Sequence, residues 1–146
     1  MAALKTVTVK ATGPDGWVVK TTAGKHEAYI DQPEAMGGTD TAPTPLDYVF
    51  IALGGCLVTI AKIVAGQKKI NLRGVEVDVT GTLDLEVLRG QNTEDRAGFE
   101  SFIANVKIDA DLTEEEKKEF LEEVDRRCPV SDNLMYATPV TIQLAK

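Results

Sequence analysis

The two cysteines, Cys56 and Cys128, are the residues of this chain best suited to carry chemistry. Cys56 ends the run Ala-Leu-Gly-Gly-Cys inside the most apolar stretch, and Cys128 opens the run Cys-Pro-Val-Ser directly after a charged segment. They lie too far apart in the sequence to form a local redox or metal motif, so only the fold can bring them together. A thiolate is a nucleophile and a redox centre, so the chemistry that these residues indicate first is thiol chemistry.

Other kinds of site find less support in the sequence. His26 is the only histidine and no Cys-x-x-Cys motif is present, so a metal site would need scattered carboxylates. No glycine-rich phosphate-binding motif occurs. Ser101 and Ser131 lack the frame of a serine nucleophile with a histidine base. We predict neither a bound metal nor a cofactor.

Length and charge limit the class of protein. A chain of 146 residues suits a single domain, 1–146, with a real core. The net charge of −7 argues against a nucleic acid or an anionic membrane as partner. The longest uncharged apolar run, residues 48–61, is shorter than the roughly 20 residues that span a bilayer. No apolar signal segment opens the chain, so we expect a cytoplasmic protein, whose cysteines are usually reduced.

The first third of the chain has the pattern of a β-sheet. Short strand-like runs cover residues 4–11, 16–22 and 25–31, with a Gly-Pro-Asp-Gly turn between the first two. Residues 32–42 contain Gly37, Gly38 and few apolar groups, which predicts a loop. A sheet of antiparallel strands is therefore expected before the first helix.

A long helix is predicted from Thr44 to near Gly66. Thr44 suits the N-cap, Pro45 the first helical position, and Asp47 completes a pattern like a capping box. The helix is apolar on every side, so it must be buried all round. A chain of this size rarely supplies that cover alone, and we infer a subunit interface.

The remaining elements complete an α+β fold. Apolar and polar residues alternate over residues 71–88 and again over 102–108, which predicts strands with one wet face. Thr113 and Glu116 form a capping box before a helix that ends near Arg127. Pro129 suits the first turn of a further short helix. Val140, Ile142 and Leu144 predict a final strand.

The local settings of the cysteines allow two interpretations. Both could be small core residues, since free cysteine is among the most buried types. Gly54 and Gly55, however, each lower helix stability by roughly 1 kcal/mol relative to alanine, which indicates that something packs closely beside Cys56. Cys128 stands at a predicted helix N-terminus, where the dipole lowers a thiol pKa. Arg126 and Arg127 add positive charge there.

Taken together, these motifs resemble the OsmC/Ohr family of osmotically inducible and organic hydroperoxide resistance proteins. The resemblance rests on Gly37-Gly38, on Pro-Thr-Pro-Leu-Asp at residues 43–47, and on the two cysteine motifs in their order. It spans nearly the whole chain. It implies an intertwined homodimer with the long helices at its centre and the active sites at the interface.

The resemblance also implies a reaction and a role in oxidative-stress defence. Cys56 would be the peroxidatic thiolate, which attacks a hydroperoxide and becomes a sulfenic acid. Cys128 would resolve it as a disulfide, and an external dithiol would reduce that disulfide. An apolar pocket around Cys56 favours an organic hydroperoxide.

Two supporting groups of the peroxidase branches are not found at their usual places. Those branches bring an arginine from the N-terminal strands to the thiol, whereas the first arginine here is Arg73. The basic residues that could replace it are Lys10, Lys20, Lys25 and His26. The glutamate position after the helix proline holds Leu46, and the acid is Asp47, about 13 Å before Cys56 along an ideal helix and on its opposite face. Asp47 is therefore first a helix cap and second a site residue.

Two other functions stay open. The missing arginine favours an OsmC-like branch that binds a small apolar or electrophilic ligand, or senses redox state, with little peroxidase activity. A purely structural disulfide between Cys56 and Cys128 is disfavoured in the cytoplasm.

Overall fold

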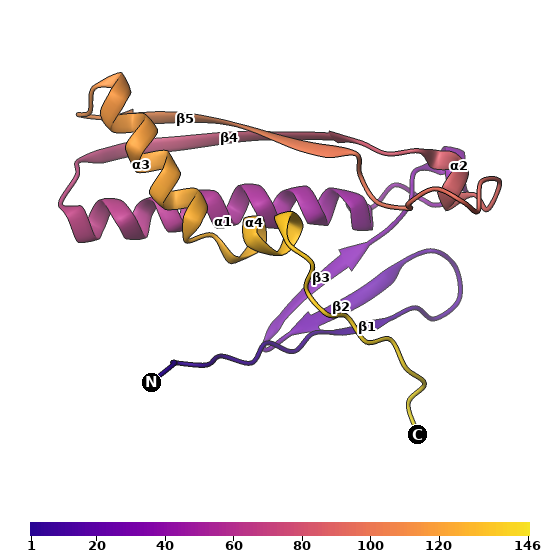
Figure 1. Ribbon diagram of the computed structural model, residues 1–146. Helices are drawn as coiled ribbons and strands as arrows, with labels where there is room; N and C mark the ends of the chain where they lie inside the picture. Colours follow the sequence, from indigo (N-terminus) through magenta and orange to yellow (C-terminus); the bar gives the residue numbers. More distant parts are fainter. The chain divides into compact units, whose positions relative to one another are not determined.

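The computed structural model describes residues 1–146 and consists of two compact units, Met1–Val49 and Phe50–Lys146 (Figure 1). Helix α1 (Pro45–Lys68) begins in the first unit and continues into the second. The mixture of helices with antiparallel strands confirms the predicted α+β class. The expectation of one domain over the whole chain stays a prediction.

The first unit contains a three-stranded antiparallel sheet in the order β1-β2-β3. Its strands are β1 (Lys10–Thr12), β2 (Val19–Ala23) and β3 (His26–Ile30). The first strand is shorter than the predicted 4–11, because β2 pairs only with residues from Lys10 onward. The apolar residues before it, Val7 and Val9, are exposed. A strand needs a partner for its backbone N–H and C=O groups, and none is present there.

A buried carboxylate organises the loop after β3. Asp31 is fully buried and accepts hydrogen bonds from the backbone N–H groups of Gln32, Thr39 and Thr41 and from both threonine hydroxyls. These donors hold the pKa of Asp31 well below its usual range, the Thr39 hydroxyl most strongly. The predicted loop also contains a short 3-10 helix, η1 (Glu34–Met36). At Gly38 any side chain would collide with the Gln32 carbonyl.

The second unit is built on a long two-stranded ribbon that packs against α1. Strand β4 (Leu72–Thr82) pairs antiparallel with β5 (Ser101–Ala110). The register places Val75 opposite Ile108 and Val77 opposite Val106, so one face of the ribbon is apolar. In Figure 1 this ribbon lies along α1, and its apolar face joins the core cluster with the helix.

Helix α1 is only partly covered within the single chain, so its burial on every side, through a subunit interface, stays a prediction. One face is buried, and its residues are Leu53, Leu57, Ala61, Val64 and Ala65. On other faces Ile51 is 53% exposed and Ile63 is 42% exposed. By length and composition α1 also meets the test for a helix that could cross a membrane, a test that core helices of soluble proteins pass as well. Its buried face belongs to the apolar core cluster of the second unit.

The alternating pattern of residues 71–88 does not continue as a strand to its end. Strand β4 stops at Thr82, and α2 (Leu85–Leu88) follows as a single helical turn. The Asp84 side chain accepts a hydrogen bond from the Glu86 N–H at 2.8 Å, which caps that turn. This local hydrogen bond favours a helical turn over the strand that the alternation of Leu83, Leu85 and Val87 predicts.

Two helices complete the second unit, α3 (Glu114–Arg126) and α4 (Pro129–Met135). The predicted capping box of α3 is confirmed, because Thr113 and Glu116 exchange hydrogen bonds of 3.2 and 2.7 Å. Phe120 and Val124 are buried in the core as the predicted stripe requires. Pro129 begins α4 as predicted.

The predicted final strand is wrong for this chain by itself. Residues 137–146 form neither strand nor helix. Val140, Ile142 and Leu144 are 80%, 95% and 98% exposed. No strand of the chain pairs with this segment, so the alternation has no sheet to join.

Candidate active site

Cys56 lies in the middle of α1, at the edge of the core. It is partly buried and packs against the core cluster, between the buried Leu53 and Leu57. The neighbouring Gly54 and Gly55 are not closely packed, contrary to expectation. A side chain at Gly54 would meet Val79 at an ordinary 3.7 Å, and one at Gly55 would meet nothing within 4 Å. Close packing beside the thiol therefore does not explain the two glycines.

Cys128 is held at the junction between α3 and α4. It is 1% exposed and forms the N-cap of α4, where its sulfur accepts a hydrogen bond from the Ser131 N–H at 3.4 Å. Its own N–H donates to the Asp125 carbonyl at 3.1 Å, and its carbonyl accepts from the Asp132 N–H at 3.1 Å. The backbone and side chain of Cys128 are therefore fixed from several sides.

The fold brings the two thiols together. Their sulfur atoms are 2.8 Å apart, with Cys128 as the donor and Cys56 as the acceptor, and both cysteines are free. A disulfide has a sulfur separation of about 2.05 Å, so only a small displacement separates this pair from a covalent bond. Figure 1 shows the short helix α4 beside α1, which is the arrangement that makes this contact possible.

The two sulfurs lie in different environments, with Cys56 partly buried and Cys128 buried. Burial, and next the hydrogen bond to Cys56, raise the pKa of Cys128 to about 11, although the Ser131 N–H acts in the opposite direction. Cys128 therefore remains a protonated thiol near neutral pH and can donate to Cys56.

The arginine that precedes Cys128, Arg127, forms its hydrogen bonds with residues other than the two cysteines. The Arg127 guanidinium donates to the Gln67 side chain at 2.9 Å and to Glu123 at 3.3 Å. Gln67 follows Cys56 by about 16 Å along an ideal helix. Arg73 is likewise paired, with Asp109 and Asp111. The Arg127 side chain thus binds near the C-terminal end of α1, although Arg127 directly precedes Cys128 in the sequence.

The other predicted site residues belong to the first unit. Asp47 accepts hydrogen bonds of 2.8 Å from the N–H and hydroxyl of Thr44, which confirms its role as a helix cap. Lys25 and His26 are exposed at the turn between β2 and β3. Lys20 is paired with Glu27 across the sheet at 2.8 Å. A role of Asp47, His26 or Lys25 at the thiols stays a prediction.

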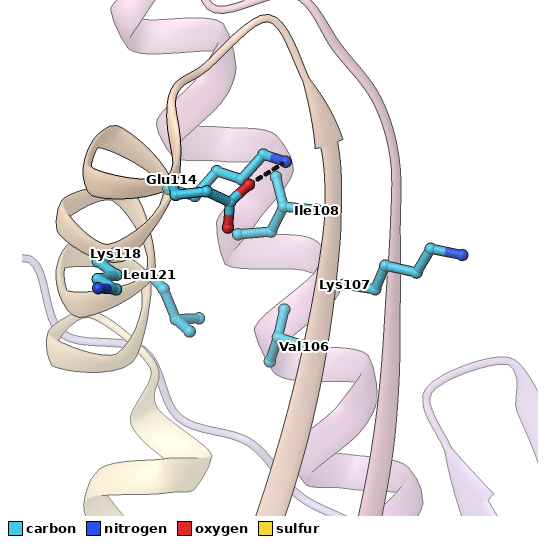
Figure 2. A pocket seen from close by; sticks show the side chains of 7 residues that line it. Val106, Lys107, Ile108, Glu114, Lys118 and Leu121 are labelled. Atoms are coloured by element: carbon cyan, nitrogen blue, oxygen red, sulfur yellow. Dashed lines mark hydrogen bonds and ion pairs between the residues drawn. The ribbon is translucent and has the colours of Figure 1, made fainter.

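Two shallow hollows lie in the second unit. One, of about 610 Å³, is lined by α1 and β4, with these residues: Phe50, Ile51, Gly54, Gly55, Val58, Thr59, Val77, Asp78 and Val79. The other, of about 360 Å³, lies between β5 and α3. In Figure 2 Val106 and Ile108 point from β5 toward Leu121 of α3, whereas Lys107 points to the other side of the strand. The first hollow contains the two glycines that precede Cys56.

Sequence reasoning missed Asp125 and Ser131 as neighbours of the thiols. The Ser131 hydroxyl donates to the Asp125 carboxylate at 2.5 Å. The only signal in the sequence was the position of Ser131 three residues after Cys128, which is the spacing of an N-cap contact. No group of three or more His, Cys, Asp or Glu side chains is placed to hold a metal ion.

The fold and the thiol pair define a class of small α+β proteins with a two-cysteine site. Within this class, the family model described as OsmC-like protein matches residues 38–143, and the chain belongs to that family. No curated protein sequence matches the chain.

Solved structures share the fold at low sequence identity. An OsmC-like protein from Mycoplasma pneumoniae is 21% identical with a TM-score of 0.78, and the match covers 90% of this chain and 88% of that one. An organic hydroperoxide resistance protein OsmC from Legionella pneumophila is 24% identical with a TM-score of 0.68, covering 91% of both chains. The organic hydroperoxide resistance protein OhrB of Bacillus subtilis is 22% identical with a TM-score of 0.57, covering 89% of this chain and 90% of that one.

Proposed function

We propose that this protein is a thiol peroxidase that reduces organic hydroperoxides through Cys56 and Cys128. The observation that carries the proposal is the 2.8 Å contact between the two sulfurs, in which the buried Cys128 donates to Cys56. The names of solved structures with this fold, which include organic hydroperoxide resistance proteins, agree with it.

The proposed reaction has three balanced steps. The Cys56 thiolate attacks the O–O bond, takes one oxygen as a sulfenic acid and, with one proton, releases the alcohol. The Cys128 sulfur attacks the Cys56 sulfur, and its proton leaves with the hydroxyl as water, which forms the disulfide. An external dithiol of the cytoplasm reduces the disulfide by exchange and is itself oxidised.

The hollow lined by Gly54 and Gly55 supports an organic substrate because it lies on α1, the helix that carries Cys56, although neither cysteine lines it. Its lining is mostly apolar, with Phe50, Val58 and Val79 among its residues. An apolar lining favours the alkyl or aryl group of an organic hydroperoxide over hydrogen peroxide. The proposal therefore predicts faster turnover of an aromatic hydroperoxide such as cumene hydroperoxide.

The proposed working form is a homodimer. The exposed apolar residues Ile51 and Ile63 on α1 and the unpaired segment 137–146 support it. Apolar surface of this kind is what a second copy would cover. A second copy would also supply a strand with which residues 137–146 could pair.

The test is hydroperoxide-dependent oxidation of dithiothreitol by the wild-type protein, Cys56→Ser and Cys128→Ser. We expect turnover in the wild type and background in Cys56→Ser. Cys128→Ser should still form the Cys56 sulfenic acid, which dimedone labels, but no intramolecular disulfide. Equal background turnover in all three proteins would refute the proposal.

One observation favours a second function, a ligand-binding or redox-sensing protein with little peroxidase activity. Arg73 and Arg127 are both engaged by acidic or amide partners, and no arginine precedes Arg73. The pH dependence of Cys56 alkylation separates the two functions. A thiolate already abundant at pH 7 supports the peroxidase, and reactivity that appears only near the ordinary thiol pKa of about 8.5 supports the alternative.

A further inference from the structure

A line of contacts extends from the thiol pair to the junction of α3 and α4. Ser131 is 8% exposed, and its hydroxyl donates to the Asp125 carboxylate at 2.5 Å. The N–H of the same Ser131 donates to the Cys128 sulfur at 3.4 Å, and that sulfur donates to Cys56 at 2.8 Å. Asp125 is thus linked through Ser131 to the sulfur that would resolve the sulfenic acid.

Ser131 makes its two contacts with different groups. The backbone N–H faces the reacting sulfur, and the side chain faces Asp125 in the last turn of α3. A hydrogen bond to a carboxylate is shorter and stronger than one between neutral groups. The Asp125 bond therefore fixes the first turn of α4, and with it the direction in which the Ser131 N–H points.

We propose that Asp125 and Ser131 are a positioning pair that holds Cys128 for attack on the oxidised Cys56. This inference rests on the proposed function, in which Cys56 is the first sulfur to be oxidised. Asp125 touches no reacting atom and acts through Ser131, whose N–H contacts the Cys128 sulfur.

The resolving step shows why the N–H matters. As the Cys128 sulfur bonds to the Cys56 sulfur, the S–O bond of the sulfenic acid breaks and the thiol proton leaves with the hydroxyl as water. Negative charge develops on the Cys128 sulfur as its proton departs. A fixed N–H donor stabilises such charge without reorganisation at the moment of reaction.

The test measures oxidation and resolution separately in wild type, Asp125→Ala, Asp125→Asn and Ser131→Ala. The reduced proteins are mixed with cumene hydroperoxide, and intact mass with dimedone labelling follows sulfenic acid and disulfide over time. We expect Cys56 to be oxidised at the wild-type rate in every variant. Disulfide formation should slow roughly tenfold in Asp125→Ala and Ser131→Ala, the effect of one charged hydrogen bond.

Two further variants separate positioning from simple loss of stability. Asp125→Asn keeps an acceptor oxygen and should restore most of the wild-type rate. Asn133→Ala is the matched control, because the Asn133 side chain donates to the Pro129 carbonyl within α4 and accepts from the Thr138 hydroxyl, and neither bond involves Cys128. If Asn133→Ala slows disulfide formation as much as Ser131→Ala, or if no variant slows it, the inference is wrong.

A second oxidant keeps this inference distinct from the proposed function. Oxidised glutathione forms a mixed disulfide on Cys56, and Cys128 then displaces glutathione by the same attack. If cumene hydroperoxide does not oxidise wild-type Cys56, the peroxidase proposal fails. The glutathione arm still decides the inference, because the same slowing in Asp125→Ala and Ser131→Ala supports it and unchanged rates refute it.

Discussion

The two compact units of this chain are held together in different ways. In Met1–Val49 the only buried side chain is that of Asp31, a carboxylate surrounded by hydrogen-bond donors. In Phe50–Lys146 a contiguous apolar cluster includes Leu57, Val64, Phe120 and Cys128. The thiol pair belongs to the unit with the apolar core, where close packing holds both cysteines in place. The first unit has polar order and little core, so we expect its stability to depend on charge and pH.

The largest loss of stability should follow from a change in the apolar core. Phe120→Ala removes a 3% exposed ring and should lower the free energy of unfolding by about 3–5 kcal/mol. Chemical denaturation followed by circular dichroism measures it. Ile103→Ala, at a residue of β5 that is 57% exposed, is the control and should change little. A smaller loss for Phe120→Ala than for any change at Asp31 would contradict the comparison.

The next largest effect should come from the buried carboxylate of the first unit. Asp31→Ala leaves three N–H groups and two hydroxyls without their acceptor, which should clearly lower the melting temperature. Thr8→Ala, on an exposed residue, is the control.

The same carboxylate should give the first unit an acid dependence. Because the pKa of Asp31 is lower in the folded state, its contribution is complete above the unfolded pKa of about 3.9 and is lost as the pH falls toward the folded value. Melting temperatures of wild type and Asp31→Asn between pH 5 and pH 2 test this, and the difference between them should shrink as the pH falls. A difference that stays constant would refute the assignment.

A smaller effect should appear in alkali, at the thiol of the second unit. The pKa of Cys128 is raised to about 11, so the unfolded chain loses this proton first and stability should fall as the pH rises from about 8.5 toward 11. Melting curves of wild type and Cys128→Ala over this range measure the difference. A parallel decline in both proteins would show that another group causes it.

The smallest effect should come from a pair on the surface of the first sheet. Lys20 and Glu27 are about half exposed and form an ion pair across two strands. Exposed pairs contribute little because water and salt screen them. Lys20→Met should leave the melting temperature unchanged within error at 0.15 M salt. A large drop would indicate that surface charge, and not Asp31, holds the first unit.

The sequence predicted those features that depend on neighbouring residues. The capping contacts of Thr44 with Asp47 and of Thr113 with Glu116 span three residues, and both are present. The apolar ribbon face followed from the alternation of residues 71–88, although Asp84 ended the strand early. The two cysteine motifs also predicted both residues of the thiol pair.

Features that depend on distant contacts were not predictable. The donors to Asp31 lie as far away as Thr41, and Asp125 reaches Ser131 from a different helix. The segment 137–146 has the pattern of a strand but no partner within the chain, and a pattern alone does not supply one. The incomplete cover of α1 has the same cause, since periodicity indicates which faces are apolar but not what covers them.

The 2.8 Å separation of the two sulfurs has a consequence for how the oxidation state is communicated. Bond formation needs a movement of roughly 0.8 Å, and Cys128 is anchored through its N–H, its carbonyl and its sulfur. The reduced and oxidised proteins should therefore have nearly the same outline. A partner protein that binds only the outer surface would therefore have nearly the same affinity for the reduced and the oxidised protein. The oxidation state of the site would instead be passed on by thiol–disulfide exchange with the thiol of another molecule.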